Sequence, residues 1–122
     1  MMDYEFFPEI DGDAMDDQFM RNLVHLRRQF GRPMPITSSY RSPEKNEAVG
    51  GVKDSAHTQG RAVDIAISGK AAYDLIRLVL TGKFGFTGVG LRQHGPHNKR
   101  MIHLDDMPDS PNQPRPILWT YA

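Results

Sequence analysis

The chain has 122 residues, and its 15 Lys and Arg balance its 15 Asp and Glu, so its formal net charge at pH 7 is zero. This balance argues against a general nucleic-acid binder, since such modules usually carry a basic excess. Cysteine is absent, which excludes disulfides, thiolate metal sites and a cysteine nucleophile. A transition metal would therefore need histidine nitrogen and carboxylate oxygen.

The sequence also lacks targeting features. No stretch approaches the roughly 20 apolar residues that a helix needs to span a bilayer. Residues 1–17 contain seven acids and neither Lys nor Arg, unlike a secretory signal. We expect a single domain over residues 1–122, made in the cytoplasm without a signal peptide, monomeric, and neither inserted in a membrane nor bound to nucleic acid.

The first half of the chain predicts two helices and two strands. Residues 1–12 form an acidic, irregular lead-in, and a helix begins near Asp13, which we expect to cap it. Apolar residues then recur at helical spacing as far as Gly31, namely Phe19, Leu23, Leu26 and Phe30. A short strand is expected over residues 35–40, a short helix from a Ser42 cap to Val49, a polar loop over residues 50–61, and a strand over residues 62–67.

The second half predicts one long helix and two strands. Ser68 is expected to cap a helix that runs to Leu80, with a buried face formed by Ala72, Leu75, Ile76, Val79 and Leu80. Two strands are expected over residues 86–91 and 100–104, joined by a polar hairpin loop. The tail over residues 108–122 is extended and packs back on the domain. This order predicts an α+β domain with a small antiparallel sheet flanked by helices.

The residues most suited to chemistry lie between Ser55 and Ile65. His57 ends a glycine-rich loop, Asp64 lies on a predicted strand, and a turn at Gly60 can bring both side chains toward one point. One imidazole and one carboxylate are two of the three protein ligands that a catalytic zinc ion needs.

His103 is the best candidate for the third ligand. It alternates with Ile102 and Leu104, so it shares the opposite strand face with Asp105. Zinc at such a site would lower the pKa of a bound water toward about 7 and polarise a carbonyl. Arg41 is a candidate to stabilise the developing oxyanion.

Spacing alone leaves simpler explanations open. His57 could be a surface loop residue, Asp64 could bond a loop backbone, and His103 could be satisfied within its strand. Ser55 is expected to bond the His57 loop or a ligand rather than to act as a nucleophile.

Four motifs in order resemble the M15, D-Ala-D-Ala carboxypeptidase-like, zinc peptidases. They are Ser38-x-Tyr40-Arg41-Ser42-Pro43 with Asn46, Ser55-x-His57-x-x-Gly60-x-Ala62-x-Asp64, Gly88-x-Gly90, and Ile102-His103-Leu104-Asp105. Arg115 and Trp119 lie where shorter members often place an Arg and a Trp. The resemblance runs from about Ile36 to Trp119.

The resemblance implies a fold shared with the hedgehog signalling domain and zinc held by His57, Asp64 and His103. It implies that Arg41 binds substrate or steadies the tetrahedral intermediate. The implied substrate is the stem peptide of bacterial peptidoglycan, cut beside a D-amino acid or at L-Ala–D-Glu. In its small size and its lack of a separate wall-binding domain, the chain is most similar to a phage or prophage endolysin. Such an enzyme would reach the cell wall through lysis machinery or a virion.

One departure from the family concerns the general base. Some relatives place an acid at the position of Arg100 and others a histidine at that of Met101. Asp105 is the first candidate for the general base, although Asp105 could instead orient a zinc ligand. His97 and His94 are the next candidates.

Two other functions are considered. The missing base suggests a wall-peptide binding module of a virion that retains zinc without cleavage. The lack of a signal sequence suggests a cytoplasmic D-Ala-D-Ala dipeptidase. Manganese, iron or cobalt would also suit two imidazoles and one carboxylate.

Overall fold

The computed structural model describes residues 5–52 and 55–121. This part of the chain is an α+β structure, as the sequence predicts. Its α-helices are α1 (Asp17–Phe30), α2 (Pro43–Ala48) and α3 (Gly69–Thr81). Short 3₁₀-helices are η1 (Gly12–Ala14), η2 (Ala56–Gln59) and η3 (His97–Lys99). The strands are β1 (Ile36–Ser38), β2 (Ala62–Ala66), β3 (Gly88–Arg92), β4 (Met101–Asp105) and β5 (Ile117–Thr120).

The five strands form one sheet in the order β1-β2-β4-β3-β5. The predicted antiparallel pairing holds for β1 with β2, β2 with β4 and β4 with β3. The tail adds β5, which pairs parallel with β3 and makes the sheet mixed. The connection that follows β4 starts beside Gly88 and returns to Gly88 from its other side, where Ile117 pairs with it. Because it begins and ends at the same end of the sheet, β5 must run in the direction of β3.

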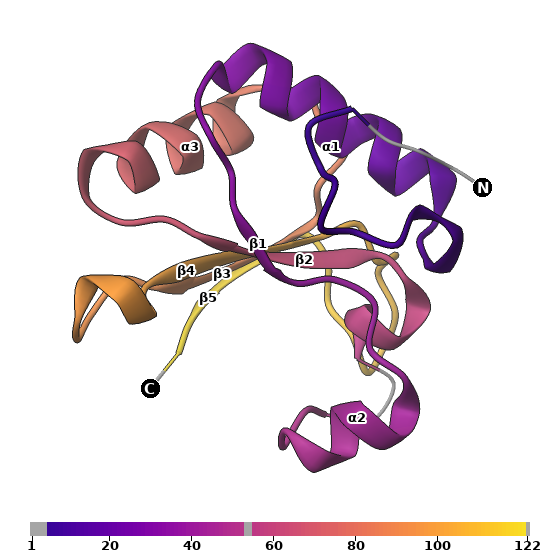
Figure 1. Cartoon of the computed structure of the whole chain (residues 1–122). Coiled ribbons are helices and arrows are strands. Elements are labelled where there is room, and N and C mark those ends of the chain that lie inside the picture. Colours follow the sequence, from indigo (N-terminus) through magenta and orange to yellow (C-terminus); the bar gives the residue numbers. More distant parts are fainter. Residues whose placement is uncertain (1–4, 53–54, 122) are drawn as a thin grey trace.

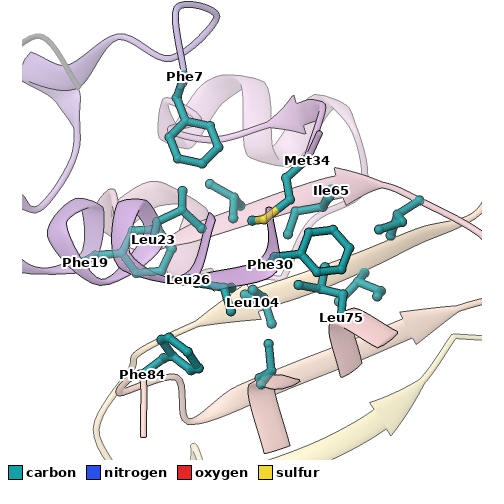
Figure 2. Packing of buried hydrophobic residues seen from close by; sticks show 14 of the residues in the cluster. Phe7, Phe19, Leu23, Leu26, Phe30, Met34, Ile65, Leu75, Phe84 and Leu104 are labelled. Atoms are coloured by element: carbon teal, nitrogen blue, oxygen red, sulfur yellow. The ribbon is translucent and has the colours of Figure 1, made fainter. Parts of the chain in front are cut away.

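The two long helices cover the same face of the sheet, while α2 lies on the other side (Figure 1). Apolar side chains from α1 and α3 pack on this face against alternate residues of the central strands. Figure 2 shows Leu23, Leu26 and Phe30 of α1 close to Ile65 and Leu104. Leu23, Leu26, Ile65 and Leu104 are fully buried. Across the described residues, none of the helices is both long and apolar enough to cross a bilayer.

Helix α1 begins later than its acidic sequence predicts. Asp16, not Asp13, is its N-cap, and the Asp16 carboxylate accepts the backbone N–H of Phe19 at 2.9 Å. The difference arises because Asp11 caps a separate 3₁₀ turn, after which Met15 is extended and interrupts the helix. The end at Gly31 is confirmed, since that glycine has the left-handed φ of 71° that closes the helix.

Helix α3 also differs in two details. Ser68 precedes it as predicted, but its side chain makes no capping bond and instead lies 3.3 Å from His97. Ala72, Leu75 and Val79 are buried and Ile76 is partly buried, whereas Leu80 is 56% exposed. The predicted apolar face was therefore too wide, because α3 contacts the sheet along a narrower stripe than the one that includes Leu80.

Alternation along the strands gives the sheet two different faces. Val63 and Ile65 of β2 face the helices, so Asp64 faces away from them. In β4, Ile102 and Leu104 face the helices, so His103 and Asp105 face away. The pairing of Asp64 with His103 across β2 and β4 then places these two side chains beside each other on the open face.

Candidate active site

A cavity of about 720 Å³ lies on the open face of the sheet. Its floor comes from β2, β3, β4 and β5, and its walls come from η2, the loop after α2 and the tail before β5. The cavity is lined by the sequence-predicted residues Arg41, Ser55, His57, Asp64, His103 and Asp105. Six of the eight candidate site residues therefore share one cavity.

Three of these side chains converge as a potential metal site. One ligand atom from each of His57, Asp64 and His103 lies within 4.8 Å of the others. The Oδ1 atom of Asp64 is 3.2 Å from Nε2 of His57 and 3.0 Å from Nδ1 of His103. Tetrahedral ligands bound at 2.0–2.1 Å from a zinc ion are about 3.3 Å apart. The donor types and both distances therefore fit zinc with little rearrangement.

Local backbone structure positions His57. It lies in η2, where the Ser55 hydroxyl accepts the His57 N–H at 3.2 Å. The carbonyl oxygen of Ser39 is 2.8 Å from Nδ1 of His57. Because a carbonyl only accepts, Nδ1 carries the proton and Nε2 presents its lone pair to the cluster. Ser55 thus supports the His57 turn, as expected.

His103 is held from both sides of its ring. Nδ1 faces Asp64, while Nε2 lies 2.8 Å from the Oδ2 atom of Asp105. Burial by itself lowers the pKa of His103, but the hydrogen bonds to Asp105 and Asp64 outweigh it and raise the pKa overall. A metal at Nδ1 would leave Nε2–H to donate to Asp105, the usual arrangement around a metal-bound histidine.

Asp105 is fully buried and has several partners. Its oxygens accept two bonds from Arg115, at 3.0 and 2.8 Å, and one from the N–H of Met107. Burial raises the pKa of Asp105, but the bonds from His103 and Arg115 prevail and lower it to about 2. A Cβ at Gly88 would come within 2.4 Å of this carboxylate, so glycine in β3 makes the arrangement possible.

Asp64 is ionised for a related reason. Burial raises its pKa, but hydrogen bonds with His103 and His57 exceed that effect and hold the pKa well below the usual range. A permanently charged carboxylate between two imidazoles is a suitable environment for a divalent cation.

Arg41 follows β1 and its backbone is tied to the His57 turn. The Arg41 N–H donates to the carbonyl oxygen of His57 at 3.1 Å. Its Nε atom is buried and, among the described residues, has no hydrogen-bond partner. Arg41 also lines the cavity and so adds a positive charge to its wall.

His97 and His94 do not join this cluster. Both are exposed and neither lines the cavity. Nδ1 of His97 lies 3.3 Å from the Ser68 hydroxyl, and His94 contacts the backbone of Tyr121. The loop between β3 and β4 carries them to the end of the sheet, because they lie beyond the paired residues Arg92 and Met101.

Three further cavity residues, one in β3 and two in the C-terminal tail, were not assigned to the cavity from the sequence. The ring of Trp119 lies 5.1 Å from that of His103, and Trp119 lines the cavity. Tyr121 and Arg92 also line it. The signal that could have found them is the i, i+2 spacing from Trp119 and Gly90. A Cβ at Gly90 would meet the Trp119 ring at 2.7 Å, so this glycine gives the indole its place.

Comparison with known proteins gives one match. A family described as Peptidase M15 matches residues 8–105 of this chain. No curated protein and no solved structure matches it. The matched range contains His57, Asp64, His103 and Asp105, whereas Arg115, Trp119 and Tyr121 lie beyond it.

Proposed function

The chain belongs to the Peptidase M15 family, and from this premise we propose that it is a zinc-dependent peptidase that cleaves the stem peptide of bacterial peptidoglycan. The observation that carries the zinc assignment is the convergence of His57, Asp64 and His103 in one cavity. The bond cleaved would be one beside D-Ala or the L-Ala–D-Glu bond. A role as a phage or prophage lysis enzyme is part of the same proposal.

Each residue has a distinct part in this mechanism. His57, Asp64 and His103 would hold the ion, which when bound supplies an activated water and a polarised substrate carbonyl. Arg41 directs positive charge into the cavity, where it would stabilise the oxygen that becomes negative during attack. Ser55 acts indirectly, by fixing the turn that carries His57.

We assign Asp105 to positioning rather than to proton transfer. Both of its oxygens are occupied, since Oδ2 contacts His103 and each oxygen also accepts a bond from Arg115. A general base needs a free lone pair directed at the proton it removes. Asp105 instead fixes the ring of His103, and Arg115 fixes Asp105.

The test is digestion of purified peptidoglycan by the protein, with chelator and then with zinc added back, followed by mass spectrometry of the released peptides. Zinc-restored release of defined fragments is expected, and the fragment masses identify the bond. His57→Ala and Asp64→Ala should abolish release. Zinc-loaded protein that releases nothing from several wall types would contradict the proposal.

One observation favours a second candidate, a wall-peptide binding module without catalysis. In the part of the chain that the structure describes, the cavity holds no carboxylate or imidazole beyond the three potential ligands and Asp105. Such a module would bind wall fragments and leave them intact. Binding of unaltered fragments in the digestion experiment would support this candidate over the peptidase.

A further inference from the structure

Among the residues that the structure describes, the cavity contains more positive than negative side chains, although the whole chain is neutral. The acids in this set are Asp64 and Asp105, and the cations are Arg41, Arg92 and Arg115. Arg115 is paired with Asp105, whereas among the described residues neither of the other two arginines forms an ion pair with a carboxylate. A bound divalent cation would increase this excess. The cavity is therefore suited to an anionic ligand.

Arg92 lies at a defined distance from the potential metal ligands. It is the last residue of β3 and pairs with Met101, two positions along from the pairing of Gly90 with His103. Two residues of antiparallel strand correspond to about 7 Å. Arg41 enters from the other end, because β1 runs antiparallel to β2 and leads toward the His57 turn. The two arginines therefore approach the ligands from opposite ends of the sheet.

Aromatic rings connect Arg92 to the metal cluster. The Arg92 guanidinium lies 5.6 Å from the centroid of the Tyr121 ring. Trp119 lies between Tyr121 and His103, with centroid distances of 6.2 and 5.1 Å. The N–H of Tyr121 donates to Leu91 at 3.0 Å, which extends the pairing of β5 with β3 and fixes Tyr121 beside Arg92. A rigid aromatic ring beside a guanidinium restricts the motion of the guanidinium and attracts its positive charge through a cation–π interaction.

Tyr121 can add a hydrogen-bond donor to this charge. Burial raises the pKa of its phenol, and although a hydrogen bond with Trp119 opposes this effect, the pKa remains above its ordinary value. The phenol is therefore neutral at physiological pH. Tyr121 lines the same cavity as Asp64, Arg41 and Arg92.

We propose that Arg92 and Tyr121 form a carboxylate-binding subsite, which selects peptides carrying a free carboxylate within about two residues of the bond at the metal ligands. An extended peptide spans about 3.3–3.6 Å per residue, so the 7 Å offset of Arg92 corresponds to about two residues. The guanidinium binds a carboxylate with two parallel hydrogen bonds. This inference rests on the proposed peptidase function and adds a specificity determinant to it.

The stem peptide offers two sources of such a carboxylate, its terminal D-Ala and the α-carboxylate of D-Glu. Two probe pairs separate them. One is diacetyl-L-Lys-D-Ala-D-Ala and its terminal carboxamide, and the other is L-Ala-γ-D-Glu-L-Lys-amide and its isoglutamine analogue, in which the terminal L-Lys carboxylate is blocked in both members. Trp119 is the only tryptophan in the chain and lines the cavity, so its fluorescence reports occupancy directly. Stopped-flow fluorescence with zinc-loaded protein records binding before turnover.

The acid of at least one pair should bind about 10- to 100-fold more tightly than its amide, as expected for hydrogen bonds to charged groups. Arg92→Gln should remove this preference while leaving the amide affinity and the zinc content unchanged. Tyr121→Phe should reduce the preference by a smaller factor. Arg77→Gln, on the exposed side of α3, is the matched control and should behave as the wild type.

Equal affinity for acid and amide in both pairs would overturn the subsite, as would an undiminished preference in Arg92→Gln. Failure of the peptidase function has a different signature. Carboxylate-selective binding that depends on Arg92 but leads to no cleavage would contradict catalysis and retain the subsite. Cleavage with the same acid preference in wild type and Arg92→Gln would retain catalysis and reject the subsite.

Discussion

Asp105 shows how much of the cavity depends on one buried side chain. Its carboxylate joins His103 in β4 to Arg115 in the tail, so one group aligns a potential metal ligand and neutralises a half-buried cation. A buried charge is tolerated only when its hydrogen-bonding capacity is met, and four bonds meet it here.

Asp105→Asn should therefore lower zinc affinity about 10- to 100-fold, because the amide no longer holds His103 as a charged acceptor. It should also lower the free energy of unfolding by about 3 kcal/mol, because Arg115 loses its counter-ion. Metal titration and chemical denaturation measure the two effects. Asp106→Asn, which removes only the neighbouring pair with Arg61, is the control and should retain zinc affinity. Unchanged affinity in Asp105→Asn would contradict the positioning role.

Arg41 makes a different kind of contribution, one that should appear only during the reaction. Arg41→Ala is expected to reduce kcat about 100- to 1000-fold, as for loss of an oxyanion donor. Zinc content should stay stoichiometric, since Arg41 is not a ligand. Lys45→Ala, on the exposed side of α2, is the control. Normal turnover by Arg41→Ala would reject the assignment.

At the scale of elements, the sequence was most informative where one residue controls one local event. Gly31 ends α1, and Ser42 with Pro43 begins α2, because each acts through its own backbone conformation. The predicted start of α1 was wrong because several aspartates could cap the helix. The extended backbone of Met15 determines that Asp16 is the one that does. Leu80 was misplaced because helical spacing gives a face but not the width of the neighbour that covers it.

The site was predictable to the extent that its residues lie in contiguous motifs. His57, Asp64 and His103 were candidates from residue type and resemblance, and the structure brings them together. Arg92 and Tyr121 were not recognised, because the i, i+2 spacing points to them only once Gly90 and Trp119 are known to face the cavity. For Trp119 and Tyr121 this depends on the parallel pairing of β5 with β3. That pairing depends on the path of the tail, which local patterns do not encode.

The difference in burial between helix positions can be tested by shortening individual side chains. Leu23→Ala in α1 removes a fully buried side chain and should lower the free energy of unfolding by about 2–5 kcal/mol. Leu80→Ala in α3, at 56% exposure, is the matched control and should change it by less than about 0.5 kcal/mol. Urea denaturation compares the two, and equal losses would mean that Leu80 is packed after all.

The connection between α3 and the segment that follows α1 should depend on pH. Asp74 of α3 bonds Lys70 and Arg32, and these bonds lower its pKa. A carboxyl whose pKa is lower in the folded state stabilises the protein above its unfolded pKa of about 3.9, and this stabilisation disappears as the pH falls through the lowered value.

Asp74→Asn should therefore have a lower Tm than the wild type above about pH 5, and the difference should shrink as the pH falls below the unfolded pKa of about 3.9 and through the lowered pKa of the folded state. Thermal unfolding at a series of pH values checks this. Because the pairs are partly exposed, 1 M salt should also reduce the difference. A difference that stays constant with pH would exclude the ionic contribution.

At the scale of the whole molecule, the potential metal site connects η2, β2 and β4. An ion that binds the folded chain stabilises it by about 2.7 kcal/mol at 100 times its dissociation constant. For a chain of this size, zinc should therefore raise the Tm by about 10 °C. Calcium should have little effect, because it prefers six to eight oxygen ligands. Differential scanning calorimetry would test this, with His57→Ala as the variant that should not respond to zinc.

The alternation along β2 and β4 has a consequence for how such a protein can change over generations. Odd and even positions of one strand belong to separate environments, one governed by packing and the other by ligand chemistry. Substitutions at the two sets should combine additively, since they share few contacts. A lineage could therefore exchange Arg92 or Tyr121, and with them the carboxylate preference proposed above, while the layer built on Val63, Ile65 and Leu104 stays as it is.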